Sequence, residues 1–448
     1  MKLTRRSTIS LLPATLLATV SGNMVFGQSV LPGSFPDIKT LQDAYIYLLG
    51  RVLIIRQEQA DLREQGIDYN IIKLNELGQP IDWVNPNLDV ANIEAWIAVN
   101  ESTPTILEFP KIEERYYTVQ ICDEWGEVIT NINQRNYPQH PYGKYAFVAP
   151  GSFAGIPDDA VRIELRSLKA KMLARVEIQG DIESAGKLQK QFRLSPMGKL
   201  GVASAPTIPE FDNRNLPGVE LFDNSREILS SAPDISPIAA QIQSNVLDIM
   251  TLAADKTHRA AIDRLLRKII IPEFQTYSVS GAGIRKNNWM GTMIIGNYGD
   301  EFAIRSAANY VGIWANSRDE VIYFVTTMDA DGLPLNGTED YVIEFPADEL
   351  PGNVVNAYWS LSLVDVPGFR AVPNELNRYT FNSIAPPLSE KDGTMKIFLS
   401  AKTDPRIPDK NRLPSPEGKP FSLTFRTYVP KNIVKQGKWF PPAIRKIV

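Results

Sequence analysis

The sequence predicts a mainly β protein with a helical middle segment, built as an N-terminal β-sandwich, then helices, then a C-terminal jelly-roll-like β-domain. Two separate parts of the chain consist of short runs rich in β-branched and aromatic residues, divided by Pro, Gly or charged turns. Between these parts, apolar residues recur at three and four positions, which is the spacing of a helix. With 448 residues and 44% hydrophobic content, the chain can bury more than one sizeable core.

Residues 1–27 have the layout of a secretory signal peptide. A basic start that contains Arg5 and Arg6 precedes an apolar run from about Ile9 to Val20, which is too short to span a membrane. The two arginines partly match a twin-arginine signal, so an ordinary and a twin-arginine export route both stay open. We expect a periplasmic or secreted protein, and no membrane insertion because no later apolar run approaches membrane-spanning length.

The charge of the mature chain argues against two classes of partner. Removal of the signal peptide moves the formal net charge from −4 to about −7, because three basic residues and no acidic ones are lost (−4 minus 3). An acidic chain with no basic block is a poor candidate for binding nucleic acid or an anionic membrane surface. We expect neither partner.

Cysteine and histidine are too scarce for several kinds of site. Cys122 is the only cysteine and lies in a strand-like run, so no intrachain disulfide can form and a buried, unreactive thiol is expected. His140 and His258 have no His or Cys neighbour at metal-ligand spacing. No dinucleotide or phosphate-binding loop follows a strand either, so the sequence predicts no metal and no cofactor.

Residues 28–70 are expected to form an N-terminal helical segment. From Thr40 to Arg63 the apolar residues follow helical spacing, which predicts an amphipathic helix with Thr40 as its N-cap. Residues 71–200 form the predicted β-sandwich, with strands from about Val84 to Arg193. Its strand-like runs are TPTILEFP, RYYTVQICDEW, KYAFVAPG, AVRIELRSL and AKMLARVEIQG.

Residues 201–295 are expected to hold a linker and the helical segment. The linker begins near Ser195, ends near Gly218, and has four prolines and no sustained period. Two helical patterns follow, the first with Ser236 as its N-cap, the second ended or kinked by Pro272. The glycine-rich stretch SGAGIRKNNW is expected to be a connecting turn.

Residues 296–448 form the predicted jelly-roll-like domain, which opens with a further helix that leads to Asn316. Strand patterns follow at turn-punctuated intervals. Among them, Asp329 and Asp331 resemble the start of a calcium loop, but Leu333 occupies the next acidic position, so a β-turn is favoured over a metal site. The strand-like runs are EVIYFVTTMD, DYVIEFP, NAYWSLSLVD, RYTFNS, TMKIFLSAK and PFSLTFRTYVP.

The run NAYWSLSLVD and the turn after it combine core and polar residues. Strand alternation places Trp359 and Leu361 on a core face and Tyr358 on the mixed opposite face. Asp365 begins the turn, and Arg378 opens the next strand. We expect Arg378 either to pair with Asp365 and fix this corner, or to offer its planar guanidinium to a ligand carboxylate or sugar hydroxyl.

The same stretches carry a family resemblance. YGDEFAIRSAANYVGIWAN, DADGLPLNGTEDYVIEF, AYWSLSLVDVPGF, NRYTF and WFPPAIRKI resemble the domain of unknown function 1214. DAYIYLLGRVL, LEFPKIEERYYTVQICDEWGEVI and GKYAFVAPG resemble its usual N-terminal partner, the domain of unknown function 1254. The resemblance covers nearly all of the mature chain. It implies a β-sandwich, a helical middle segment and a jelly-roll-like domain in exported bacterial or related proteins, and it supplies no established activity.

The chain departs from the family pattern at two places. Members of the N-terminal domain often carry an Asn-Asn-Asp-Thr-like polar run, where this chain has Asn92 and Glu94. If that run is a site in relatives, it is altered or lost here. Arg412 stands where a Trp is common in the C-terminal domain.

We expect the protein to bind a polar small molecule or glycan in a cleft between the two β-domains, because such clefts use polar and aromatic side chains. One alternative is an extracytoplasmic hydrolase or lyase that uses Asp or Glu with Arg or Tyr, and another is a structural or oligomeric interaction protein. Whether the chain is an enzyme stays open, and no catalytic residue is predicted. The candidate ligand-binding residues are Arg115, Tyr117, Asp123, Tyr358, Asp365 and Arg378.

Overall fold

The computed structural model describes residues 35–77, 87–366, 368 and 370–447. The predicted signal peptide and Val84, the expected start of the sandwich strands, lie outside these residues. From Ile38 onward the chain forms one compact unit. The predicted domain limits inside this unit therefore stay predictions.

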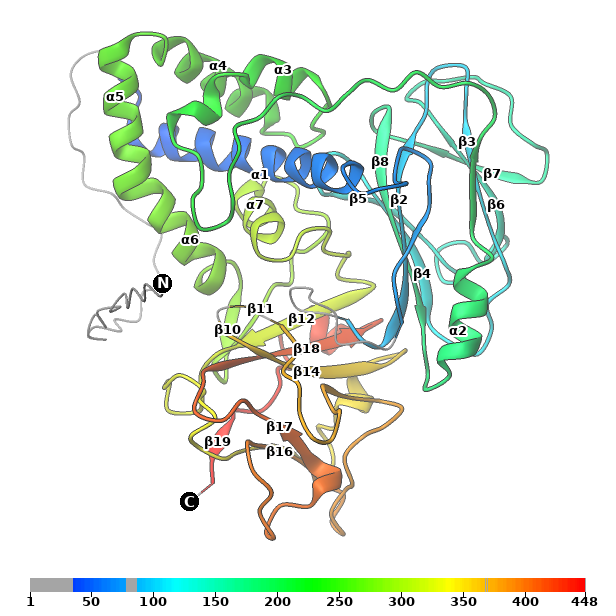
Figure 1. Ribbon diagram of the computed structural model, residues 1–448, viewed down its shortest axis with the longest axis vertical. Helices are drawn as coiled ribbons and strands as arrows, with labels where there is room; N and C mark the ends of the chain where they lie inside the picture. The colour runs from blue at the N-terminus through cyan, green and yellow to red at the C-terminus, as the bar shows by residue number, and fades with distance from the viewer. Residues whose placement is uncertain (1–34, 78–86, 367, 369, 448) are drawn as a thin grey trace, which may run out of the picture. The chain divides into compact units, whose positions relative to one another are not determined.

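The described residues form four β-sheets, and a group of helices between residues 219 and 280 lies in the chain between the first two sheets and the last two. In Figure 1 the strands of the first two sheets are blue to green, the helices of the middle segment green, and the strands of the last two sheets yellow to red. This order confirms the predicted mainly β fold with a helical middle segment.

Two sheets of the N-terminal region pack face to face as a sandwich. Their strand orders are β1-β2-β8-β4-β5 and β7-β6-β3-β9. Ile93, Val119 and Phe147 belong to the apolar core between them. The strands are β1 (Lys73–Leu74), β2 (Val90–Ala98), β3 (Thr105–Phe109), β4 (Tyr117–Cys122), β5 (Val128–Ile132), β6 (Gly143–Val148), β7 (Ala160–Glu164), β8 (Lys169–Glu177) and β9 (Arg193–Pro196).

Strand alternation makes the other face of the five-stranded sheet polar. In β4, Val119 and Ile121 belong to the sandwich core, so Thr118 and Gln120 face away from it. In β8, Lys171 is likewise opposite the core. These polar side chains are nevertheless buried. Other parts of the chain must therefore cover this face and supply hydrogen-bond partners.

Helix α1 (Ile38–Leu62) is one of those parts, and it contacts α3, α4 and α7 as well. All its residues from Leu41 to Ile55 except Asp43 are buried. The prediction of an amphipathic helix is therefore wrong, because α1 is covered on nearly all sides. Thr40 is not an N-cap either, since the helix begins at Ile38.

Most of the remaining helices lie in the middle segment, between residues 219 and 311. The first predicted helix starts at Ala239 after the N-cap Ile238, so the expected N-cap at Ser236 is wrong by two residues. The second contains a π-helical turn directly before Pro272, a residue that has no N–H to donate. The helices are α2 (Ile182–Gln189), η1 (Val219–Phe222), α3 (Ser225–Ser230), α4 (Ala239–Leu252), α5 (Lys256–Leu265), η2 (Leu266–Ile270), α6 (Ile271–Ser280), α7 (Phe302–Val311), η3 (Pro351–Val354), η4 (Asp409–Asn411) and α8 (Asn432–Lys435).

Two further sheets enclose the C-terminal core. Their strand orders are β10-β11-β12-β18-β14-β15 and β17-β16-β13-β19. Trp359 and Leu361 lie in this core as predicted, and the Trp359 ring stacks on Phe425 at 5.6 Å. The strands are β10 (Ile284–Lys286), β11 (Trp289–Gly291), β12 (Val321–Thr326), β13 (Tyr341–Phe345), β14 (Trp359–Asp365), β15 (Thr380–Asn382), β16 (Met395–Ser400), β17 (Arg412–Pro414), β18 (Phe421–Tyr428) and β19 (Arg445–Lys446).

Two local predictions in this region have different outcomes. The stretch SGAGIRKNNW is not a simple turn, because it forms the hairpin β10–β11, with positive φ at Asn287 and Asn288. The turn at Asp329 is confirmed. Its carboxylate accepts hydrogen bonds from the backbone N–H groups of Asp331 and Leu333.

Candidate functional site

The six-stranded sheet has a polar face opposite its apolar core. Ser360 on β14 pairs in register with Asn382 on β15 and with Arg426 on β18, and Arg426 pairs with Tyr323 on β12. Trp359 and Leu361, on either side of Ser360, and Phe425, before Arg426, belong to the core. Four polar side chains therefore form one row across four strands.

Three tyrosines meet beside this row. The Tyr358 and Tyr428 rings stack with their centroids 4.0 Å apart, and the Tyr116 ring packs edge-on against them at 5.6 and 5.4 Å. Tyr116 precedes β4, so it comes from the N-terminal region, whereas the other two come from the C-terminal one. Burial raises the pKa of all three phenols above the ordinary value. They therefore stay protonated and can donate hydrogen bonds.

Asp89, just before β2, brings a carboxylate into the same place. Its Oδ1 accepts a hydrogen bond of 2.7 Å from the Asn382 amide. Burial raises the pKa of the Asp89 carboxyl, and the Asn382 amide, the Ser360 hydroxyl and the Arg426 charge act in the opposite direction. Asp89 is 6% exposed, Tyr358 2% and Ser360 0%.

Three atoms of this group make no hydrogen bond that meets the usual distance and angle limits within the described chain, although Ser360 lies close enough to Asp89, and Tyr428 to Tyr358, to affect their pKa values. They are Asp89 Oδ2, Tyr358 OH and Ser360 Oγ. A buried polar atom without a partner costs about 1–3 kcal/mol, so most buried polar atoms in proteins are satisfied. We call the set that surrounds these atoms the polar layer. It consists of Asp89, Tyr116, Tyr358, Ser360, Asn382, Arg426 and Tyr428.

Glu320, just before β12, closes one side of the polar layer. Its carboxylate accepts a hydrogen bond of 2.9 Å from Tyr116 OH and two of 2.7 and 2.6 Å from Arg135. Asn133 donates to it at 3.0 Å. All these donors come from the N-terminal region, so Glu320 ties the two regions together.

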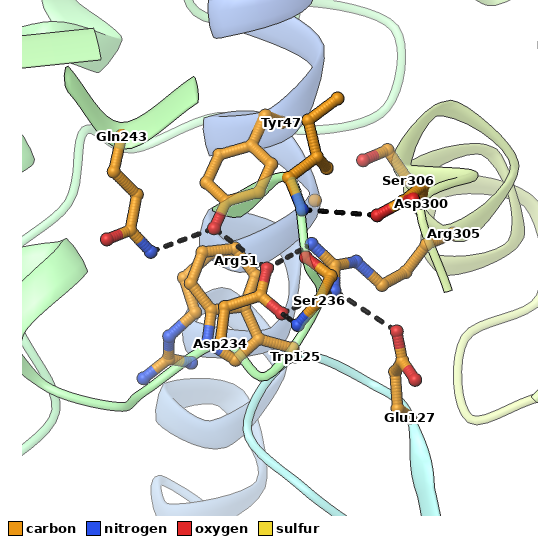
Figure 2. Close-up of polar contacts among 12 residues, drawn as sticks. Tyr47, Arg51, Trp125, Glu127, Asp234, Ser236, Gln243, Asp300, Arg305 and Ser306 are labelled. Carbon is orange, nitrogen blue, oxygen red and sulfur yellow. Dashed lines mark hydrogen bonds and ion pairs between the residues drawn. The ribbon is translucent and has the colours of Figure 1, made fainter. Parts of the chain in front are cut away.

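A second buried polar group lies under α1 and is drawn in Figure 2. We call Tyr47, Trp125, Glu127, Asp234 and Arg305 the Asp234 cluster. They come from α1, the turn between β4 and β5, the loop before α4, and α7. Asp234 accepts hydrogen bonds from Tyr47 OH at 2.7 Å, from Arg305 at 3.1 and 2.7 Å, and from the backbone N–H of Ser236 at 3.0 Å.

The charges of the Asp234 cluster compensate one another. Burial alone would raise the pKa of Asp234, but the hydrogen bonds and charge of Arg305 hold it below its ordinary value. Arg305 also donates to Glu127 at 3.2 Å and lies 4.8 Å from the Trp125 ring centroid. Both oxygens of Asp234 are engaged. This cluster is therefore suited to joining elements of the fold, although Arg305 Nε has no hydrogen-bond partner among the described residues.

Only one predicted site residue, Tyr358, belongs to the polar layer. Arg115 precedes Tyr116 in the sequence, and its side chain donates a hydrogen bond to the Glu177 carbonyl. Tyr117 points the other way, into the sandwich core, and its hydroxyl donates to the Pro141 carbonyl.

The other three candidates lie elsewhere. Asp123 accepts from two backbone N–H groups of its own turn and pairs with Arg166 at 2.6 Å. The expected pair between Asp365 and Arg378 is wrong, because Asp365 accepts from the Arg370 N–H and Arg378 donates to the Asp409 and Arg412 carbonyls. Ligand binding by the six candidates stays a prediction.

Asn92 and Glu94 lie on the same outer face of the five-stranded sheet as Lys171. Glu94 pairs with Lys171 at 3.1 Å and accepts from the Asn75 amide at 2.7 Å. The Asn92 carbonyl accepts from the Gln189 amide at 2.8 Å. A ligand role for these two residues also stays a prediction.

The described residues contain no grouped metal ligands, and their one cysteine is buried. No three His, Cys, Asp or Glu side chains among them are grouped to hold a metal ion. Burial raises the pKa of the Cys122 thiol to about 12, so the thiol stays protonated at neutral pH. Within the same part of the chain, no helix is both long and apolar enough to cross a membrane.

Two family models match the chain. "Protein of unknown function (DUF1254)" matches residues 71–196 and "Protein of unknown function (DUF1214)" matches residues 320–432. The chain belongs to the two-domain DUF1254/DUF1214 family. Asp89 and Tyr116 lie in the DUF1254 match and the other members of the polar layer in the DUF1214 match, so the polar layer lies where the two domains meet.

One solved structure supports the fold of this DUF1254/DUF1214 chain. The VPA0106 protein from Vibrio parahaemolyticus is similar with a TM-score of 0.62 at 20% identity, over 92% of this chain and 100% of that one. An uncharacterized protein from Burkholderia cenocepacia has a TM-score of 0.44 at 10% identity, over 91% of this chain and 94% of that one. No curated protein matches the chain.

Proposed function

We propose that this DUF1254/DUF1214 protein is exported and binds a polar small molecule or glycan at the polar layer between its two domains. The observation that carries the proposal is the group of three neighbouring buried atoms without partners, Asp89 Oδ2, Tyr358 OH and Ser360 Oγ. The signal-peptide pattern of residues 1–27 supports export.

The chemistry of the three atoms favours a ligand with hydroxyl groups. A hydroxyl can donate to the Asp89 carboxylate and accept from Tyr358 or Ser360, so one kind of group satisfies all three. A ligand carboxylate would instead be placed beside the Asp89 carboxylate, with repulsion as the result. Sugars and polyols are therefore the first ligands to test, and small organic acids the second.

The test is a thermal-shift screen of sugars, polyols and small organic acids with the wild type and Asp89→Asn. A ligand at 100 times its Kd stabilises the folded state by about 2.7 kcal/mol, which raises the melting temperature measurably. We expect a hydroxyl-rich ligand to shift the wild type and to lose its shift in the variant, which keeps an acceptor for Asn382. Asp159→Asn, which changes an exposed aspartate paired with Lys144 outside the polar layer, is the matched control.

Two results would reject the proposal. One is the absence of any shift in the wild type at millimolar ligand. The other is an equal shift in the wild type, Asp89→Asn and Tyr358→Phe, because binding would then occur elsewhere.

Hydrolase or lyase activity is the second candidate function, and one observation favours it. A carboxyl whose pKa is raised by burial, such as that of Asp89, is suited to act as a general acid. Chromatography of any ligand found by the screen, after incubation with the protein, distinguishes the two functions. Conversion by the wild type and not by Asp89→Asn indicates an enzyme, and unchanged ligand indicates binding alone. Oligomerisation stays a prediction.

A further inference from the structure

A hollow of about 340 Å³ lies on the C-terminal domain. One wall is the loop Val372–Glu375 and the other is the turn Pro414–Lys419, with Ala401 between them. No residue that lines it belongs to the polar layer. Its volume is at the lower end of the range for small-molecule sites.

Arg412, on β17, is a buried cation beside this hollow. Its side chain is 1% exposed, and it donates to Glu375 at 2.6 Å and to Asp409 at 3.2 Å. Its Nη1 has no partner in the part of the chain that the structure describes. An unpartnered guanidinium N–H group can be satisfied only by an acceptor.

Ser415 provides a second unsatisfied group. It lines the hollow directly, is 6% exposed, and its Oγ has no partner among the described residues. Ser415 lies three residues after Arg412, just beyond the end of β17. Two unsatisfied hydrogen-bonding groups therefore lie at or beside one hollow.

Glu375 lies between Arg412 and the solvent. It lines the hollow, bonds Arg412, and its side chain is 57% exposed. The hydrogen bond from Arg412 lowers the pKa of Glu375, so the carboxylate is charged at neutral pH. Because the Glu375 side chain is exposed, its carboxylate can turn into the solvent, and another carboxylate can then take its place on Arg412.

We propose that this hollow binds a small organic monocarboxylate, whose carboxylate takes the place of Glu375 on Arg412 and accepts a hydrogen bond from Ser415. Arginine forms paired hydrogen bonds with carboxylates, which accounts for the choice of anion. Val372, Pro373, Ala401 and Pro414 give the hollow apolar walls, which favour a ligand with an apolar body. The site is separate from the polar layer, so it is a second binding site.

The test is titration calorimetry of the full chain with benzoate, and with benzamide as a neutral probe of the same shape. The wild type is expected to bind benzoate and not benzamide. Glu375→Ala removes the internal competitor, so it is expected to bind benzoate at least tenfold more tightly. Ser415→Ala is expected to bind several-fold more weakly, and Arg412→Met not at all.

Three results would overturn the proposal. They are no benzoate binding by either the wild type or Glu375→Ala, equal affinity for benzoate and benzamide, and equal affinity in the wild type and Ser415→Ala. Because Glu375→Ala and Ser415→Ala change groups at the protein surface or without partners, they test the proposal even if Arg412→Met does not fold. Asp89→Asn is expected to leave benzoate affinity unchanged, which separates this site from the one proposed above.

Discussion

Two buried aspartates show how the same side chain takes opposite roles. Asp234 accepts four hydrogen bonds, two of them from Arg305, and the pKa of its carboxyl is lowered. Asp89 accepts one side-chain hydrogen bond, keeps one oxygen without a partner in the described residues, and has a raised pKa. The first arrangement stabilises the fold. The second arrangement lowers stability because it buries a carboxylate oxygen without a partner, and such costs are common at binding sites.

Replacement of each aspartate by asparagine is expected to change stability in opposite directions. Asp234→Asn leaves Arg305 short of a buried counter-charge and should cost about 3–5 kcal/mol at neutral pH. Asp89→Asn removes a charge that burial disfavours and should stabilise the protein by about 1 kcal/mol. Urea unfolding at several pH values measures both effects.

The change of stability with pH tests whether the charge of each aspartate causes the effect of its substitution. The pKa of Asp89 is raised in the folded protein, so ionisation of this carboxyl destabilises the fold once the pH rises above the unfolded pKa of about 3.9. The free energy of unfolding that Asp89→Asn gains over the wild type should therefore grow above that pH. The pKa of Asp234 is lowered in the folded protein, so its carboxylate stabilises the fold above about pH 3.9 and loses this effect as the pH falls. The loss of unfolding free energy in Asp234→Asn should therefore shrink in acid. A stability gain that is independent of pH would contradict the role given to the Asp89 charge.

At the scale of elements, one loop holds the five-stranded sheet against the C-terminal region. The Gly296 carbonyl accepts a hydrogen bond of 2.7 Å from the Val128 N–H on β5. Gly296 has a φ of +76°, and a Cβ there would lie 2.5 Å from the backbone nitrogen of Ser317. Gly299 has a φ of +59°, but a Cβ there meets nothing within 4 Å.

Alanine substitutions at Gly296 and Gly299 allow the cost of backbone strain to be measured apart from the cost of crowding. Gly296→Ala is expected to cost about 3 kcal/mol or more, because strain and a backbone clash add. Gly299→Ala is expected to cost about 1 kcal/mol, from its backbone conformation alone. Equal melting temperatures for the two variants would show that the loop is not packed as described.

Strand alternation explains which elements the sequence predicted well. The core face of β14 is predicted correctly, and β18 shows the same alternation of apolar and polar residues from Phe421 to Arg426. The helix predicted from Thr40 to Arg63 is confirmed as α1, and only its amphipathic character is wrong, because its polar residues are also buried. Arg51 pairs with Glu124 at 3.1 Å and Glu58 with Lys169 at 2.7 Å, contacts that no local pattern contains.

The polar layer could not be predicted because it depends on contacts between distant parts of the chain. Asp89 meets Asn382, which is 293 positions later. The predicted ligand-binding residues include Tyr117 and not Tyr116, although strand alternation places only one of the two outside the sandwich core. The sequence could show that one of these tyrosines faces outward, but not what it meets there.

At the scale of the whole molecule, polar contacts join the DUF1254 and DUF1214 domains. Glu320 receives hydrogen bonds from Tyr116, Asn133 and Arg135, and Asn87 donates to Tyr428 at 2.7 Å. Hydrogen bonds depend on distance and direction, so these contacts fix how the two domains meet. A binding site that uses both domains requires such a fixed arrangement.

We expect the wild type to unfold in one calorimetric transition and Glu320→Ala to unfold in two. The variant loses the acceptor of three buried or partly buried donors, which should weaken the contact between the domains by about 3 kcal/mol. Glu417→Ala, which breaks an exposed ion pair, is the control and should keep a single transition within about 0.5 kcal/mol of the wild type. A single transition in Glu320→Ala at the wild-type temperature would mean that the apolar contacts alone couple the domains, and that the polar layer is free to serve ligand binding without a structural role.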